Sequence, residues 1–353
     1  MNQSQKQFEF KNVDELKIFL KYQQRPSLQY QQRFKDLLLQ KVEQSPIKFD
    51  SNLSIKEFQT QYDSKVPVII NGLDEDWENW NWDYLIQNYK DCYFRCAIDD
   101  DGNYLKLRFD QYIQYFQDNS DYNPLYIFDG DIPKNMLNQY KIPYLFPQDY
   151  LANLKQKRPQ YRWILCGPKQ SGSMIHIDPY ETSAWNSVVL GKKRWVMFPP
   201  SIDKNIVKGK SLISQEVLST INNPIDYFSI IVPLIKEYCD QQNIQYYDFI
   251  QSEHETVYVP NGWWHAVLNI EDCVAVTQNY VSDQNFEKFW IAFNKENPTL
   301  SQQFQTNVQQ ENEELYKRIL ILNERFNIQI KSLQQDDNVS EQDSLEDFQN
   351  QFD

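Results

Sequence analysis

The chain has 353 residues, of which 41% are hydrophobic and 15% aromatic, as in a folded protein with a sizeable core rather than a disordered chain. It carries 35 basic and 49 acidic residues, which gives a formal net charge of −14. An acidic chain has no long-range attraction for phosphate backbones, so we expect no direct binding of nucleic acid. No apolar run is long enough to span a membrane, and we expect no membrane partner.

Residues 1–60 are predicted to form a helical extension. Apolar residues recur at helical spacing in "NVDELKIFLKY" and in "QYQQRFKDLLLQKVEQ". The first residues show neither the charged nor the apolar region of a secretory signal, and the five cysteines are irregularly spaced. We therefore expect reduced thiols and an intracellular location, either nuclear or cytoplasmic.

Short β-rich runs follow one another from residue 65 onward, separated by turn residues. The runs are "CYFRCAI", "YLKLRF", "LYIFD", "YRWILCGP", "SMIHIDP", "AWNSVVL", "KRWVMFP", "ETVYVP", "HAVLNI" and "CVAVTQNY". Such a series predicts a mainly β fold, either a sandwich or a barrel, with helices at both ends.

The domain boundaries follow from changes in these patterns. We expect a β domain over 61–297, with its core at about 122–282 and a helix-like insertion at 201–254. Helical spacing recurs at 283–296 and at about 308–332, which predicts a C-terminal helical segment at 298–333. The remaining residues, 334–353, are acidic and polar and are predicted to be disordered.

One of the three histidines lies two residues from an aspartate, in "SMIHIDP". Residues i and i+2 of a strand point to the same face, so His176 and Asp178 would project side by side. An imidazole and a carboxylate are two members of the 2-His-1-carboxylate triad that binds Fe(II) and leaves positions open for cosubstrate and oxygen. The alternative is an ordinary His–Asp hydrogen bond at the surface or in the core.

A third ligand should be a histidine on another strand. His265 begins the run "HAVLNI" directly after the turn "VPNGWW", which would fix its direction. His254 lies in "QSEHETV" between two glutamates, where a solvated turn is expected. We therefore select His265 as the ligand and His254 as a surface histidine.

The run "GKKRWVMFPP" is predicted to be a strand that begins with cationic residues. Alternation places Lys193, Trp195 and Met197 on one face, while Lys192 and Arg194 would face water. An inward lysine without a partner is a costly buried charge. It is accounted for if Lys193 meets the far carboxylate of a dicarboxylate such as 2-oxoglutarate; otherwise it is one more surface cation.

The two stretches "HIDPYETSAWNSVVLGKKRWVMFPP" and "ETVYVPNGWWHAVLNIEDCVAVTQNY" together resemble the Jumonji-C (JmjC) dioxygenases. Within that family they are most similar to the bifunctional arginine demethylases and lysyl hydroxylases, also called phosphatidylserine-receptor-like. The resemblance runs from about Leu53 to Phe293. It implies a double-stranded β-helix, a jelly-roll or cupin-like barrel, that uses Fe(II), 2-oxoglutarate and O2.

The resemblance places the metal ligands on His176, Asp178 and His265, in agreement with the choice made from the residues. It also implies contacts to 2-oxoglutarate at five positions, with Lys193 and Thr277 at the far carboxylate and further contacts from Asn186, Tyr126 and Ser173. Ser173 stands where the family has threonine.

The resemblance implies an oxygenase that acts on protein side chains. We expect lysyl hydroxylation because it needs no prior methylation, and N-methyl-arginine or N-methyl-lysine demethylation by the same iron centre is the alternative. The charge of −14 favours a basic protein or peptide substrate. Two readings remain as rivals, a non-catalytic peptide-binding barrel and a non-oxidative cupin.

The ends of the chain leave two questions open. The helical ends could form a homodimer or could cap the barrel. The acidic C-terminus replaces the basic nuclear-localisation runs of the subfamily, so a nuclear location rests on the resemblance alone.

Overall fold

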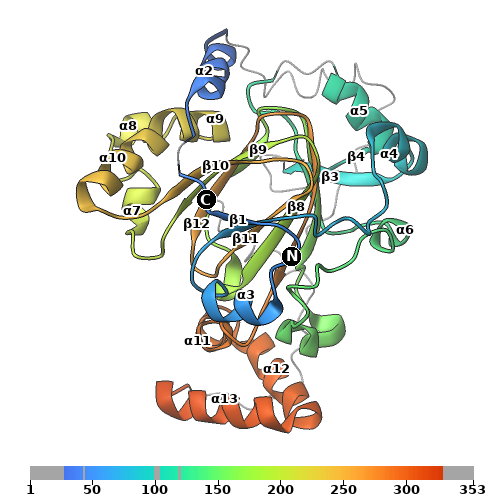
Figure 1. The fold of residues 1–353 in the computed structure, drawn as a ribbon, viewed down its shortest axis with the longest axis vertical. Coiled ribbons are helices and arrows are strands. Elements are labelled where there is room, and N and C mark those ends of the chain that lie inside the picture. The colour runs from blue at the N-terminus through green and yellow to red at the C-terminus, as the bar shows by residue number, and fades with distance from the viewer. Residues whose placement is uncertain (1–27, 43, 99–103, 118–120, 329–353) are drawn as a thin grey trace.

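Two facing β-sheets form the body of the protein (Figure 1). The computed structural model describes residues 28–42, 44–98, 104–117 and 121–328. The larger sheet contains, in spatial order, β1 (Ile47–Phe49), β2 (Val68–Asn71), β11 (Glu255–Val259), β8 (Ser183–Leu190), β13 (Cys273–Tyr280), β6 (Arg162–Gly167) and β5 (Ile127–Asp129). The smaller sheet contains β10 (Tyr247–Gln251), β9 (Lys193–Phe198), β12 (Trp264–Asn269) and β7 (Gly172–His176).

The chain winds between these two sheets. From β6 to β9, and again from β10 to β13, each strand lies in the sheet opposite to the previous one. Neighbouring strands are antiparallel except for the β1–β2 pair. This is the winding of a double-stranded β-helix, so the fold predicted from the sequence is confirmed.

Apolar side chains fill most of the space between the sheets. One group gathers around Trp195, Met197 and Phe249, and a second around Trp163 and Leu165. Burial of each such side chain contributes roughly 1.5–3 kcal/mol to folding. A pocket lies between the two groups and is lined by members of both.

Two sets of helices cover the outer faces of the sheets (Figure 1). The larger sheet packs against α3 (Ile55–Gln61), α4 (Trp82–Tyr89), α5 (Phe109–Gln117), α6 (Lys134–Leu137) and the hairpin of β3 (Tyr93–Ile98) and β4 (Tyr104–Arg108). The smaller sheet packs against α2 (Leu28–Leu39), α7 (Lys204–Val207), α8 (Gln215–Leu218), α9 (Pro224–Asp226), the π-helix η3 (Tyr227–Ile231) and α10 (Val232–Gln242).

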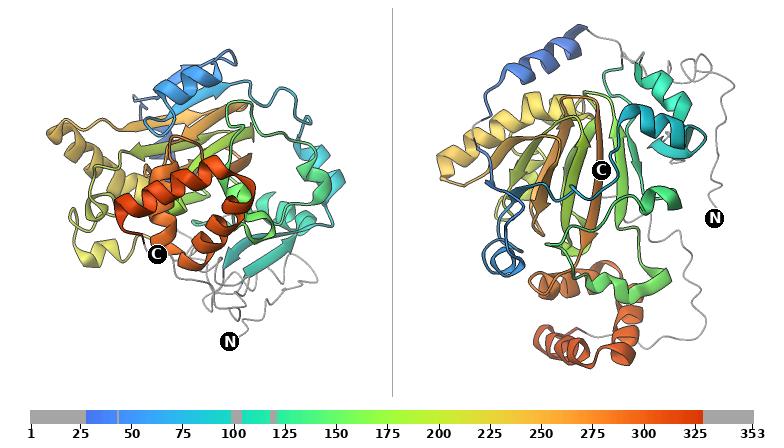
Figure 2. Two further views of the ribbon diagram at one scale, coloured as in Figure 1. Left: turned by 90° about the horizontal axis from the view of Figure 1, so that it is seen from below. Right: turned by 45° about the vertical axis from the view of Figure 1, so that its right-hand side comes forward.

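Three C-terminal helices lie across one end of the sheets (Figure 2). They are α11 (Phe286–Glu296), α12 (Pro298–Glu311) and α13 (Glu313–Phe326), and they pack with the 3₁₀ segment η1 (Tyr150–Lys157) around a core of aromatic residues. The side chains of Asn297 and Asn312 cap α12 and α13 by accepting from Leu300 N and Leu315 N. The break at Asn312 divides the segment about 308–332, where the sequence pattern suggested one helix, between the end of α12 and α13.

Every predicted β-rich run corresponds to a strand, and the errors lie in the segments expected to be helical. β1 lies within 1–60 and β10 within 201–254, two segments with helical or helix-like patterns, and neither strand was predicted. The acidic tail and the "NVDELKIFLKY" helix lie outside the described residues.

The prediction that Arg194 faces water is wrong. Lys192 is exposed and forms an ion pair with Glu271, but Arg194 is only 2% exposed. Its Nε and Nη2 donate to the two oxygens of Asp248 at 2.9 and 2.8 Å, and its Nη1 donates to Leu37 O at 3.2 Å. Arg194 does point away from the barrel interior, but α2 covers that face.

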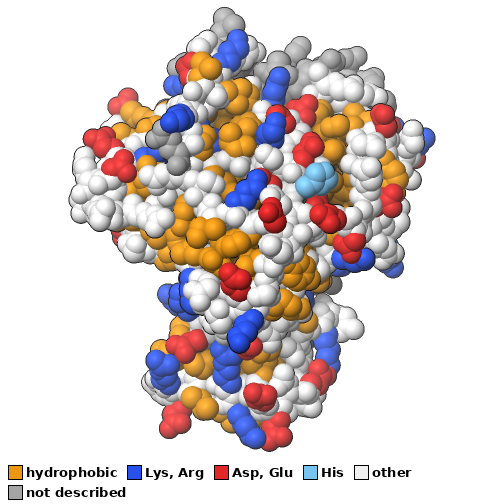
Figure 3. All heavy atoms as spheres, viewed as in Figure 1, with side chains coloured by type: hydrophobic (Ala, Val, Ile, Leu, Met, Phe, Trp, Pro, Cys, Tyr) orange, Lys and Arg blue, Asp and Glu red, His pale blue; other side chains and the backbone are white. Residues whose placement is uncertain are grey.

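The surface is mixed in charge. Acidic and basic side chains are interspersed on the face shown in Figure 3, with apolar side chains between them. Among the described residues, no helix combines the length and the apolar character needed to cross a bilayer.

Replacement of Arg194 by methionine is expected to destabilise the protein by about 3 kcal/mol, because it removes the bidentate partner of a buried carboxylate. Of the described residues, Lys236 alone would remain as a charged partner of Asp248. Urea unfolding followed by circular dichroism measures the change. Lys192→Met is the matched control, and an equal effect of the two substitutions would contradict the assigned ion pair.

Candidate metal centre

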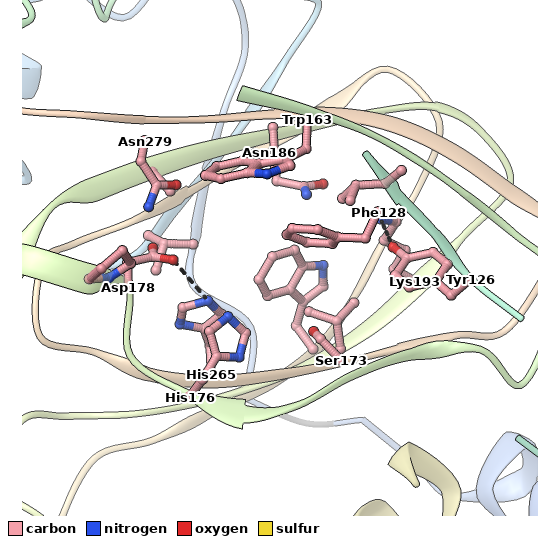
Figure 4. A pocket seen from close by; sticks show the side chains of 17 residues that line it. Tyr126, Phe128, Trp163, Ser173, His176, Asp178, Asn186, Lys193, His265 and Asn279 are labelled. Atoms are coloured by element: carbon pink, nitrogen blue, oxygen red, sulfur yellow. Dashed lines mark hydrogen bonds and ion pairs between the residues drawn. The ribbon is translucent and has the colours of Figure 1, made fainter. Parts of the chain in front are cut away.

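A pocket opens between the two sheets, and polar side chains project into it from both (Figure 4). Its lining residues are Tyr126, Phe128, Trp163, Leu165, Ser173, His176, Asp178, Pro179, Ala184, Asn186, Lys193, Trp195, Val259, His265, Val267, Thr277 and Asn279. All eight residues singled out from the sequence are among them.

His176 and Asp178 enter the pocket from the end of β7. His176 is the last residue of the strand, and Asp178 keeps an extended backbone with φ −63° and ψ 143° before the 3₁₀ turn η2 (Pro179–Glu181) begins. The two side chains therefore stay on the same side, as expected of residues i and i+2.

His265 faces His176 across the β7–β12 ladder. The two residues are directly paired in the antiparallel register, and their ring centroids are 4.1 Å apart. His265 Nε2 lies 3.9 Å from Asp178 Oδ1. Two strands distant in sequence thus bring three potential ligands together.

Both imidazole rings are oriented by backbone carbonyls. His176 Nδ1 is 2.8 Å from Met174 O, and His265 Nδ1 is 3.0 Å from Trp263 O. Each Nδ1 must carry the proton to donate to a carbonyl, which leaves each Nε2 as a lone-pair donor toward the shared space. The rings are therefore in the tautomer that a metal site requires.

Burial keeps the histidines neutral. It lowers the pKa of His176 to about 4, with a further decrease from His265, and it lowers the pKa of His265 to about 4. Burial raises the pKa of Asp178, against the opposing effects of His176 and of a hydrogen bond from Asn279. Neutral imidazoles are the form that binds metal at physiological pH.

The arrangement fits a divalent metal ion. Ligand atoms of His176, Asp178 and His265 all lie within 4.8 Å of one another, and they are the one group of this kind among the described residues. Asp178 Oδ2 is buried without a hydrogen-bond partner in the part of the chain that is described. Such an atom is costly unless something binds it, and two imidazoles with one carboxylate are the ligand set of non-haem Fe(II) oxygenases.

Lys193 lies at the other end of the pocket. It is 1% exposed, and its Nζ donates to Tyr126 OH at 3.3 Å. No carboxylate among the described residues forms an ion pair with it, and burial lowers its pKa. This inward cation is therefore free to receive the carboxylate of a ligand.

The other residues expected to contact 2-oxoglutarate line the walls. Asn186, on β8, has a buried Oδ1 without a partner in the described part of the chain. Thr277 faces the pocket from β13, but its hydroxyl donates to Trp185 O at 2.8 Å. Ser173 lines the pocket from β7.

Asn279 is a polar lining residue that the sequence reasoning missed. Its side chain lowers the pKa of Asp178 against the effect of burial, and its Nδ2 donates to Thr182 Oγ1 at 3.1 Å. Its position two residues after Thr277 on β13 places both on the same face of the strand, and that spacing could have identified it.

His254 lies away from the pocket, as expected. Its side chain is 67% exposed, and its Nδ1 is 2.9 Å from Asp74 Oδ2. This contact joins the turn before β11 to the segment that follows β2.

Comparison with known proteins identifies the family. The family model described as "JmjC domain, hydroxylase" matches residues 163–280, which include all three candidate ligands. The Caenorhabditis briggsae protein named bifunctional arginine demethylase and lysyl-hydroxylase psr-1 is 35% identical over 278 residues, covering 76% of this chain and 69% of that protein. The chain belongs to the JmjC family.

Two further relatives agree. Lysine-specific demethylase JMJ21 of Arabidopsis thaliana is 35% identical over 247 residues, which are 67% of this chain but only 25% of that protein. A Drosophila melanogaster homologue of the 2-oxoglutarate and iron-dependent oxygenase JMJD4 is 26% identical over 298 residues, covering 68% of this chain and 65% of that one. The expected dioxygenase with Fe(II), 2-oxoglutarate and O2 is thereby confirmed.

His176→Ala is expected to weaken Fe(II) binding by more than about 100-fold, because it removes one of only three protein ligands. His254→Ala is the matched control and should bind Fe(II) like the unmodified protein. Anaerobic titration with Fe(II) in the presence of 2-oxoglutarate, followed by visible absorbance, measures both. Full binding by His176→Ala would rule out this site.

Proposed function

We propose that this JmjC protein hydroxylates lysyl side chains in basic protein segments. The supporting observation is one pocket with three potential metal ligands at one end and, at the other, the cation of Lys193, which forms no ion pair among the described residues. A dicarboxylate cosubstrate can bridge these two ends, which accounts for a buried charge that would otherwise be costly. Relatives named for lysyl hydroxylation support the choice of reaction.

Fe(II) and 2-oxoglutarate, when bound, supply the oxygen activation that converts a substrate C–H bond to an alcohol. The protein's own residues hold and orient these groups. His176 and His265 offer their Nε2 lone pairs because Met174 O and Trp263 O accept their Nδ1 protons. Lys193, with Tyr126 beside it, would bind the far carboxylate, while Trp163 and Trp195 line the pocket and exclude water.

The substrate assignment rests on charge and on the names of relatives. A net charge of −14 favours basic partners during encounter. Hydroxylation of a lysine carbon leaves a stable alcohol, whereas hydroxylation of an N-methyl group releases formaldehyde. Demethylation of N-methyl-arginine or N-methyl-lysine is the second candidate, because relatives are also named arginine demethylase and lysine-specific demethylase.

Two further parts of the proposal concern the whole protein. A homodimer through the C-terminal helices is supported by Leu320, Ile321 and Phe326 of α13, which are 45%, 65% and 38% exposed. An intracellular location, nuclear or cytoplasmic, remains a prediction from the sequence.

Lys193→Met is expected to weaken 2-oxoglutarate binding by roughly 30-fold or more, as expected for loss of a buried charge partner. The same change should raise the melting temperature of the ligand-free protein, because a buried unpaired cation is removed. Calorimetry on Mn(II)-loaded protein and thermal denaturation measure the two effects. Lys192→Met is the control, and unchanged 2-oxoglutarate affinity in Lys193→Met would reject the assigned role.

Incubation with lysine-rich and methyl-arginine peptides distinguishes the two reactions. Lysyl hydroxylation adds one oxygen atom to a lysine, and demethylation removes a methyl group and releases formaldehyde. Mass spectrometry should show the first, dependent on 2-oxoglutarate and absent in His176→Ala. Methyl loss without lysine oxidation would favour the second candidate, and no change to any peptide would favour a barrel that binds without oxidising.

A further inference from the structure

Two consecutive residues just after Asp178 have left-handed backbone conformations. Tyr180 and Glu181 both have φ of 54°. Residues other than glycine enter this region at an energetic cost, and such strain persists only where the surroundings overdetermine the backbone. The contacts that hold this turn therefore indicate a constraint on the neighbouring metal ligand.

The Glu181 side chain bonds to a second turn, the one that precedes β12. Asn261 Nδ2 donates to Glu181 Oε2 at 2.8 Å. The neighbouring Gly262 has φ +74°, and a Cβ built there would lie 3.0 Å from Glu181 Oε2, so the carboxylate packs directly against this turn. Asp178 lies three residues before Glu181, and His265 lies four residues after Asn261. The hydrogen bond thus joins the two segments that carry two of the three ligands.

Asn261 is itself held rigidly. It is 1% exposed, Ser64 Oγ donates to its Oδ1 at 2.6 Å, and its backbone N–H donates to Ser183 Oγ at 3.2 Å. On the other side, Asn285 Nδ2 donates to Glu181 O at 3.3 Å. Both partners of the Glu181–Asn261 bond are therefore tied to elements outside the pocket.

The turn containing Asn261 also orients His265. Trp263 N donates to Pro260 O at 3.3 Å and closes the turn, and Trp263 O accepts the proton of His265 Nδ1. We propose that Glu181 and Asn261 form a clamp that positions Asp178 and His265 for metal binding. This inference rests on the metal site assigned above and adds two positioning residues to it.

Calorimetric titration of the full chain with Co(II), a redox-stable probe for the site, tests the clamp. Glu181→Ala removes the clamp and keeps the backbone strain, whereas Glu181→Gly removes both. We expect Co(II) affinity to fall about tenfold in both variants, as on loss of a residue that orients a metal ligand. Glu181→Gln keeps an acceptor oxygen for Asn261 Nδ2 and should stay within about threefold of the unmodified protein.

Thermal unfolding of the metal-free variants separates positioning from stability. Glu181→Gly should unfold at the same or a higher temperature than Glu181→Ala, because glycine adopts φ +54° without strain. If affinity merely followed stability, glycine would restore Co(II) binding, and that result would overturn the clamp. Unchanged affinity in Glu181→Ala would also overturn it. Failure of the unmodified protein to bind Co(II) would reject the metal site itself.

Discussion

The antiparallel pairing of β7 with β12 determines the chemistry of the pocket. In this register His176 and His265 are direct partners, so two imidazoles face one space without any special loop. A slip by one residue would turn one of them to the opposite face of the sheet. Aromatic and aliphatic packing on both sides of the smaller sheet fixes that register, and Asp178 needs only an extended backbone to join the pair.

β9 carries two buried cations that have different roles. Arg194 points outward and is satisfied by Asp248, so it fastens α2 to the barrel. Lys193 points inward, and within the described ranges its one side-chain hydrogen-bond partner is the Tyr126 hydroxyl. The alternation of the strand separates a cation that stabilises the fold from one that is kept for a ligand.

The sequence was sufficient to predict what depends on alternation and residue chemistry. The ten β-rich runs, the three clustered ligands and the inward direction of Lys193 follow from such local patterns. What it could not predict depends on tertiary contact: α2 covers Arg194, and Asn279 gains its role from its effect on Asp178. The strands β1 and β10 pair with β2 and β9 although they lie in segments of helical or helix-like pattern. The left-handed backbone at Tyr180 and Glu181 could not be predicted either, because residue propensities disfavour that conformation.

The large separation of His176 and His265 along the chain has a consequence for how the protein matures. Their pairing closes a long loop that includes β8, β9, β10, β11 and the helical insertion, and non-local pairing of this kind makes folding slow. A complete set of ligands exists only after that loop has closed. Metal binding by all three ligands therefore follows the pairing of β7 with β12, and a chain that ends before residue 265 has no complete site.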